Sequence, residues 1–178
     1  MTLTGKRVRL RAFESEDLQA EHAMMNEEET LRAMLRGIPF PTSMADEQQW
    51  LGGQSSYTRG EYQFAVENED GELIGRCGPT KVDWKNRVGE LGIVIAGRWR
   101  GQGYGSEAMV LLCGFCFGEM NLRKLKVAVL ASNKAALRCY EANGFRREGT
   151  LRGEVFRGGR YVDVELLARF AEADMTEE

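Results

Sequence analysis

The stretch that decides the fold is Arg98-Trp99-Arg100-Gly101-Gln102-Gly103-Tyr104-Gly105-Ser106. It follows residues 89–96, a run that is typical of a strand, and it leads into an amphipathic helical stretch. The three alternate glycines leave the backbone open, so that successive N–H groups can converge on an anion. The N-terminus of the following helix adds partial positive charge, and Arg98 and Arg100 add full charges. The loop therefore predicts a cradle for a phosphate or a pyrophosphate.

Two other phosphate-binding fingerprints do not fit this loop. A dinucleotide fingerprint has Gly or Ala at its third conserved position and follows the first strand of a βαβ unit. Counting from Gly101 that position is Ser106; counting from Gly103 it is Ala108, but the loop lies in the middle of the chain and not after its first strand. A P-loop needs Gly-Lys followed by Ser or Thr, and the sequence has no such run. The remaining spacing resembles the acetyl-coenzyme A pyrophosphate loop of the GNAT superfamily of N-acetyltransferases, Arg100-x-x-Gly103-x-Gly105. The alternative is a tight strand-to-helix connection that binds nothing.

A second motif lies about 30 residues further along the chain. In residues 131–145 a strand ends near Asn133, a helix carries Tyr140, and Gly144-Phe145 opens the next strand, which is similar to the second GNAT signature. Residues 8–18 and the closing hairpin, 148–163, resemble the RimJ/RimL-type ribosomal-protein acetyltransferases and the spermidine N-acetyltransferases. The resemblance covers nearly the whole chain. It is most specific over residues 90–163 and weakest over residues 26–59.

The resemblance implies an α+β protein with the GNAT fold, a single domain over residues 1–178 whose mixed, mostly antiparallel sheet of about seven strands is flanked by helices. The local patterns agree with that order of elements. Ser15 is expected to cap the first helix, and Asp70-Gly71 is expected to turn a hairpin. The expected strands are 8–13, 62–66, 73–82, 90–96, 124–130, 145–151 and 161–167. The expected helices include 18–25, 30–35, one that starts at Ser43, the one after the glycine loop, and 134–142.

Composition is that of a soluble globular protein. The 178 residues are 43% hydrophobic and 29% charged, and the net charge of −3 implies no basic surface for nucleic acid. No apolar run approaches the roughly 20 residues of a membrane span, and the N-terminus lacks the apolar core of a signal peptide, so we expect a cytoplasmic protein with no membrane contact. Cys113 and Cys116 lack a second cysteine pair, and His22 is the only histidine, which favours buried thiols and no metal.

Acetyl transfer from a thioester to an amine needs a neutral amine, a stabilised oxyanion and a protonated leaving thiolate. The resemblance implies that Tyr140 is the general acid; the alternative is a core aromatic residue. Glu90 opens the central strand, where the family often places a base or an amine-binding carboxylate; the alternative is a solvated carboxylate at a strand end. Another GNAT branch carries its base five residues before the asparagine, and Ala128 at that position excludes this arrangement.

Acetyl-coenzyme A is the implied co-substrate, with no metal. The loop amides, the pantetheine-binding strand and the asparagine together give the expected contacts, which are Ile93, Val94, Ile95, Arg98, Arg100, Gly101, Gln102, Gly103, Tyr104, Gly105, Ser106 and Asn133. Asn133 is equally suited to cap its helix. The resemblance implies direct transfer in a ternary complex, and it is compatible with a homo-oligomer.

The acceptor is expected to be a primary amine: a polyamine, another small amine or a protein N-terminus. The acidic run Glu27-Glu28-Glu29 either faces a cation or is an exposed helix start. Four aromatic residues are candidates for the acceptor pocket or for the core: Trp50, Tyr57, Tyr62 and Trp84. Two other functions were weighed. Tyr140 and Glu90 argue against a non-catalytic acyl-coenzyme A sensor, and the failed fingerprints argue against a nucleotide-binding module.

Overall fold

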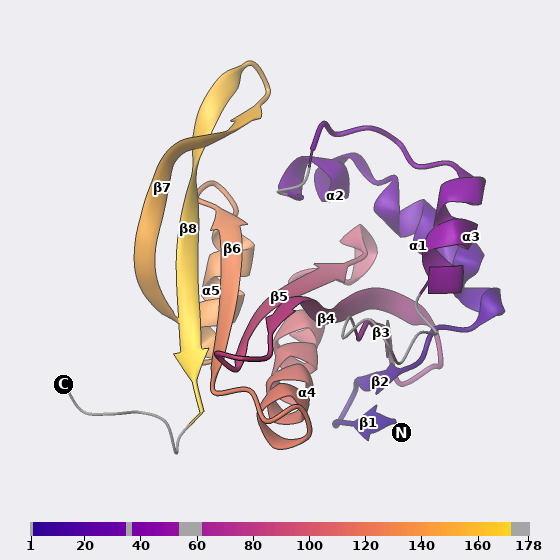
Figure 1. Ribbon diagram of the computed structural model, residues 1–178. Coiled ribbons are helices and arrows are strands. Elements are labelled where there is room, and N and C mark those ends of the chain that lie inside the picture. The colour runs from indigo at the N-terminus through magenta and orange to yellow at the C-terminus, as the bar shows by residue number, and fades with distance from the viewer. Residues whose placement is uncertain (1, 35–36, 54–61, 172–178) are drawn as a thin grey trace.

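One mixed, mostly antiparallel sheet of eight strands organises the computed structural model, which describes residues 2–34, 37–53 and 62–171 (Figure 1). The strands lie in the order β1-β2-β3-β4-β5-β6-β8-β7, and only β5 and β6 are parallel neighbours. The strands are β1 Leu3–Thr4, β2 Arg9–Arg11, β3 Phe64–Glu67, β4 Leu73–Asp83, β5 Val88–Ile95, β6 Lys124–Leu130, β7 Arg146–Arg157 and β8 Arg160–Phe170. The predicted α+β class is confirmed, and the short β1 is a strand that the sequence pattern did not predict.

Five α-helices cover the two faces of the sheet within the described residues. They are α1 Leu18–Met25, α2 Glu28–Ala33, α3 Met44–Gly53, α4 Tyr104–Gly118 and α5 Lys134–Ala142. Two short 3₁₀ helices accompany them, η1 Ser15–Asp17 and η2 Gly97–Trp99. Helices α4 and α5 pack against each other and cover one face, while α1 packs on β4 from the other face and α3 packs on α1.

The core lies between the sheet and the pair α4–α5. Leu10, Ile74 and Leu125 from the sheet are completely buried, as are Met109 and Leu112 from α4. Apolar residues recur along α4 at helical spacing, so that one side of the helix meets the strands. Cys113 and Cys116 belong to this buried side, and burial raises their pKa values to about 11 and about 12, as expected for structural thiols.

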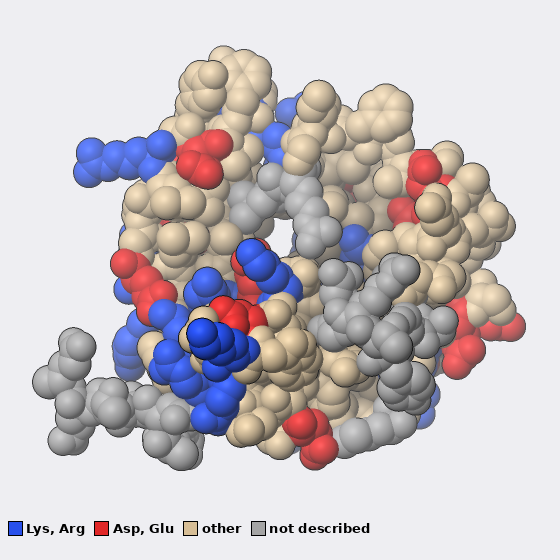
Figure 2. Space-filling model, viewed as in Figure 1, with Lys and Arg blue, Asp and Glu red and all other residues tan. Residues whose placement is uncertain are grey.

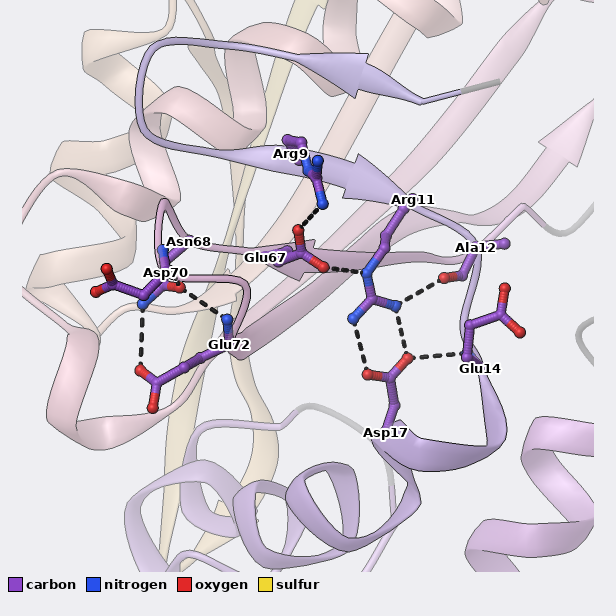
Figure 3. Close-up of polar contacts among 9 residues, drawn as sticks. All are labelled: Arg9, Arg11, Ala12, Glu14, Asp17, Glu67, Asn68, Asp70 and Glu72. Carbon is purple, nitrogen blue, oxygen red and sulfur yellow. Dashed lines mark hydrogen bonds and ion pairs between the residues drawn. The ribbon is translucent and has the colours of Figure 1, made fainter.

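The first helical turn starts one residue earlier than predicted. Glu14, not Ser15, is the capping residue, because its side chain accepts from the Asp17 N–H while the Asp17 carboxylate accepts from the Glu14 N–H at 2.9 Å. Arg11 on β2 donates to the same carboxylate at 2.7 and 2.9 Å and also pairs with Glu67 on β3 (Figure 3). Burial opposes ionisation of Asp17, but these hydrogen bonds outweigh it and lower the Asp17 pKa. The network therefore fixes η1 to the edge of the sheet.

The two halves of the sheet separate between β5 and β6. Register pairs join these strands only at Val88–Lys124, Gly89–Leu125 and Glu90–Lys126, although β5 continues to pair with β4 as far as Ile95. Beyond Glu90 the strands diverge, and the gap opens toward their C-terminal ends (Figure 1). Figure 2 shows the molecule hollowed at this place, between the β6–β8 half and the elements around α2.

Three of the aromatic candidates for the acceptor pocket are placed by the structure. Trp50 packs edge-on against Phe13, and Tyr62 packs edge-on against Phe115 of α4. Trp84 is 52% exposed, and Tyr57 lies outside the described residues. Trp50 and Tyr62 thus make packing contacts of the kind that the core interpretation requires.

The described part of the chain offers neither a membrane-spanning helix nor a cluster of metal ligands. None of its helices has the length and apolar character needed to cross a membrane. Within residues 2–34, 37–53 and 62–171, no group of three or more His, Cys, Asp or Glu side chains is placed to hold a metal ion.

Candidate functional site

The N-terminus of α4 presents open backbone donors at the end of β5. The first helical hydrogen bond runs from the Glu107 N–H to the Gly103 carbonyl at 3.1 Å, which leaves the N–H groups of Tyr104, Gly105 and Ser106 without helical acceptors. No side chain caps this terminus. A 15-residue helix with free N–H groups at its start fits a diphosphate, as the glycine spacing predicts.

Two glycines give the loop its shape. Gly101 has φ +74° and Gly103 has φ +89°, values that L side chains adopt only with strain. A Cβ at Gly101 would have no heavy atom within 4 Å, so the loop surface there is open. Gly105 has ordinary helical geometry, and a Cβ there would stand 3.5 Å from Ile95. The first two glycines therefore give the loop its backbone conformation, whereas a Cβ at Gly105 would make only an ordinary van der Waals contact with β5.

Contacts from the start of the chain hold the loop in place. The Arg7 guanidinium donates to the Gln102 carbonyl at 2.6 Å and lies 4.3 Å over the ring of Tyr104. The Tyr104 side chain is buried and donates to Glu69 at 3.1 Å, so only its backbone N–H faces the cradle. The Gln102 side chain donates to the Arg98 carbonyl at 2.9 Å. Sequence reasoning missed Arg7, because nothing local marks a residue that acts almost 100 positions away.

The predicted phosphate-binding arginines both have protein partners. Arg100 donates to the Ile95 carbonyl at 2.7 Å and to Glu29 and Glu27 at 2.9 and 3.1 Å. Arg98 is exposed and lies 3.5 Å from Glu72. Arg100 therefore acts first as a clamp between β5 and α2, and the backbone donors of the loop carry more of the anion-binding capacity than the sequence suggested.

Glu27 completes this clamp. Its carboxylate accepts from the Gly97 N–H at 3.0 and 2.9 Å, and from Thr30 at 3.0 Å. Glu28 is exposed and pairs with Arg32 in the next turn, as the solvated interpretation of the acidic run expects. The acidic run Glu27-Glu28-Glu29 was identified from the sequence, but its role in joining α2 to the glycine loop was not predicted.

The backbone of β5 is open toward the gap at alternate residues. The Ala96 N–H donates to the Ile74 carbonyl on β4, so the ladder pattern also directs the polar groups of Val94 toward β4. The polar groups of Ile93 and Ile95 consequently point toward the gap, and the Ile95 carbonyl is the one that accepts from Arg100. Of the three predicted residues, Ile93 and Ile95 are placed to meet a pantetheine arm.

Asn133 and Ser106 have structural partners as well as a place near the gap. Asn133 caps α5, with its side chain accepting from the Ala136 N–H at 3.1 Å. The Ser106 hydroxyl accepts from Asn143 at 2.9 Å, which ties the start of α4 to the end of α5. Cys139 on α5 also faces the start of α4, since its sulfur stands 3.9 Å from a Cβ built at Gly105.

Tyr140 and Glu90 lie on opposite faces of the sheet. Tyr140 is 6% exposed in the α4–α5 core against Phe145, and burial raises its pKa, so the phenol stays protonated. No described residue hydrogen-bonds its hydroxyl. Glu90 alternates with the buried Leu91, so its side chain projects from the other face at the last register pair before the strands diverge. Glu90 thus stands at the start of the gap, and Tyr140 lies in the core on the other face of the sheet.

Comparisons with known proteins agree with this geometry. The family profile described as an acetyltransferase (GNAT) domain matches residues 7–146. Spermidine N(1)-acetyltransferase of Vibrio cholerae is 30% identical over 158 residues, which cover 89% of this chain and 90% of that protein. A crystal structure of the Vibrio cholerae spermidine N-acetyltransferase in complex with CoA and spermine has a TM-score of 0.82 and 29% identity, covering 92% and 95% of the two chains.

A second structure shows likeness of fold alone. It is RimL, a ribosomal L7/L12 alpha-N-protein acetyltransferase in complex with coenzyme A, with a TM-score of 0.86 and 19% identity, covering 98% of this chain and all of that one. The predicted GNAT membership and the resemblance to spermidine N-acetyltransferases are confirmed by the family profile and the Vibrio cholerae matches.

Proposed function

Because this chain belongs to the GNAT acetyltransferase family and is an acetyl-coenzyme A-dependent N-acetyltransferase, we propose that it moves the acetyl group directly to a primary amine within a ternary complex. The observation that supports the proposal is that Glu90 lies at the last register pair before β5 and β6 diverge, while the Tyr140 phenol lies in the core on the other face of the sheet. Acetyl-coenzyme A supplies the activated thioester, and the chain supplies binding, orientation and proton transfer.

The binding step uses backbone groups. The free N–H groups of residues 104–106 take the pyrophosphate, and the polar groups of Ile93 and Ile95 pair with the pantetheine arm as a short added strand would. The Ile93 N–H, directed into the gap, is our candidate for stabilising the oxyanion. Arg100 and Glu27 keep the loop and α2 in register with β5.

The proton transfers run in opposite directions. Glu90 accepts a proton from the incoming ammonium, directly or through a water molecule, so that the neutral amine can attack. Tyr140 donates a proton to the departing thiolate. A protonated phenol without a protein partner for its hydroxyl is suited to that role. Cys139 neighbours Tyr140 on α5, and burial raises its pKa, which disfavours a thiolate and hence a covalent acyl-enzyme.

Glu90→Gln tests the assignment of the base. Glutamine keeps the shape and hydrogen bonding of the side chain but cannot accept the proton. We expect kcat/KM for the amine to fall by about 10² or more and the acid limb of the pH–rate profile to weaken, with the KM for acetyl-coenzyme A little changed. The measurement is release of free thiol with an acceptor found by screening polyamines, amino acids and N-terminal peptides. Wild-type turnover and pH dependence in the variant would assign the base to water or to another residue.

A further inference from the structure

Three arginines surround two adjacent cavities between α2 and the tip of the β7–β8 hairpin. The cavity of about 310 Å³ is lined by Arg32 from α2, by Arg157 and Arg160 from the hairpin, and by Leu130 at the end of β6. The neighbouring cavity of about 510 Å³ shares Arg32 and Arg157. The elements that line them, α2 and the tip of the β7–β8 hairpin, lie at the end of the sheet toward which β6 runs (Figure 1).

The positive charge in these cavities is largely uncompensated. Arg157 donates to the carbonyls of Met34 at 2.7 Å and Phe156 at 3.0 Å, and its Nε is buried without a partner. None of the ion pairs in the described part of the chain includes Arg157 or Arg160. Arg32 pairs with Glu28 at 2.8 Å, but both side chains are exposed, so this pairing is weak.

Carboxylates are scarce around the arginines. Among the described lining residues, the smaller cavity has no acidic side chain, and the larger has one, Glu154, which is exposed. Two carbonyl contacts orient Arg157 without neutralising it. An oriented guanidinium that lines a cavity and has no carboxylate partner among the described residues is a site for a carboxylate or another oxyanion.

The cavity lies on the same face as the proposed base. Glu90 is in register with Lys126 on β6, and Leu130 follows four residues later on the same face of that strand. Four residues of strand span about 13 Å. An extended peptide has the same rise, so a peptide whose amine is at Glu90 would bring its fourth side chain nearly level with Leu130, beside the arginines. Glu90 is also flanked in register by Lys81 and Lys126, which adds positive charge on this path.

We propose that the acceptor is a peptide or protein N-terminus with an acidic side chain within its first four residues, and that Arg157 and Arg160, assisted by Arg32, bind that carboxylate. This inference rests on the proposed function and narrows its acceptor. A polyamine is disfavoured. With one of its amines bound at Glu90, its second ammonium would lie among the arginines, and like charges repel each other. Arg157 and Arg160 are thus specificity residues, and they touch neither the acetyl group nor the loop.

The test compares three acceptors in the intact protein: Ser-Ala-Glu-Glu-amide, the neutral Ser-Ala-Gln-Gln-amide, and spermidine. Thiol release gives kcat/KM for each, and calorimetry gives the affinity of both peptides for the coenzyme A complex. We expect the acidic peptide to exceed the neutral one by about tenfold or more, as charge-assisted hydrogen bonds would give. Arg160→Gln and Arg157→Gln should each move this ratio toward one. Arg160 is exposed and has no ion-pair partner, so Arg160→Gln should fold normally.

Arg152→Gln is the matched control. Arg152 is an exposed arginine of the same hairpin that lines neither cavity, so its loss should leave the peptide preference unchanged. Equal use of both peptides, or a preference for spermidine, overturns the proposal. A second result would also overturn it: Arg157→Gln and Arg160→Gln raise the KM for acetyl-coenzyme A but keep the preference for the acidic peptide. The cavity would then bind a phosphate of the cofactor and not the acceptor. If no amine is acetylated, the proposed function fails, and the calorimetric comparison alone decides on the anion site.

Discussion

Glu27→Gln should weaken the binding of acetyl-coenzyme A, although the Glu27 side chain is not one of the expected contacts to the cofactor. In the native protein both Glu27 oxygens accept from the Gly97 N–H, and Oε2 also accepts from Thr30 at 3.0 Å and from Arg100 at 3.1 Å. Glutamine keeps one acceptor oxygen, while its amide NH₂ must face groups that are themselves donors. The tie between α2 and the start of the glycine loop is thereby lost, and the loop is less well ordered for the pyrophosphate.

The magnitude follows from the number of contacts and their exposure. Hydrogen bonds to charged groups contribute about 1.5–3 kcal/mol where water is excluded. The Glu27 and Arg100 side chains are 32% and 33% exposed, so solvent screening reduces that contribution. We take about 1–2 kcal/mol for the tie, which corresponds to about 5–30-fold in affinity. The loss should raise the KM for acetyl-coenzyme A while kcat changes little, because the loop does not contact the reacting atoms.

Steady-state kinetics with acetyl-coenzyme A varied at saturating acceptor, together with calorimetric titration of coenzyme A, measure this effect. Glu29→Gln is the control, since Glu29 contacts the same arginine at 2.9 Å but is 84% exposed. We expect less than about a twofold effect from it. An unchanged KM in Glu27→Gln, or equal increases in both variants, would refute the clamp and leave the acidic run as a solvated helix start.

Three other outcomes are expected. We expect acetyl-coenzyme A to stabilise the native protein in thermal melts and Gly103→Val to abolish that stabilisation, because φ at this position is +89° and a branched side chain would stand at the cradle; a retained shift would contradict the cradle. Tyr140→Phe should lower kcat by about 10² or more with cofactor affinity unchanged, and equal turnover would return Tyr140 to a packing role. Burial raises the pKa of Glu21 from 4.5 to about 7; Arg76 partly offsets this effect and Glu47 reinforces it. The folded protein therefore binds this proton more tightly than the unfolded chain does. The resulting stabilisation is complete below pH 4.5 and is lost as the pH rises to about 7. Urea midpoints from pH 4.5 to 8 should show Glu21→Gln removing up to about 3 kcal/mol of this dependence, and identical slopes would contradict it.

Local signals predicted the elements around the site well. Helix α5 begins after an asparagine that caps it, and β6 is a short apolar run between polar residues, so both were predicted with their observed bounds. The glycine loop was predicted because its alternate glycines leave the backbone open to an anion, and two of them, Gly101 and Gly103, have positive φ, which glycine adopts without strain. The capping residue of η1 was missed, since Ser15 and Glu14 are both plausible and the choice depends on Asp17, which Arg11 holds from a neighbouring strand.

Long-range pairing explains what the sequence did not reveal about the site. Arg100 stands at a phosphate-binding position of the motif, yet its partners are on α2, about 70 residues earlier. Likewise, the N–H and C=O groups of β5 that point toward the gap are those that do not hydrogen-bond to β4. A sequence pattern cannot specify which residues of β5 pair with β4 in this way. The place of Glu90 at the last register pair before β5 and β6 diverge depends on the pairing of two strands that are far apart in the chain, which no local motif records.

The short helix α2 determines the width of the gap between β5 and β6. Only three register pairs join β5 to β6, so the two halves of the sheet share a narrow seam and little else on that side resists their rotation. At one end α2 is fastened to the β5 half through Arg100, and the residue that follows its other end, Met34, is fastened to the hairpin half through Arg157. The length of α2 therefore sets the width of the gap between the two halves of the sheet. Each residue added to the helix would widen that gap by about 1.5 Å. Substrate size in this scaffold can thus change through the length of one helix, with the cofactor loop left as it is.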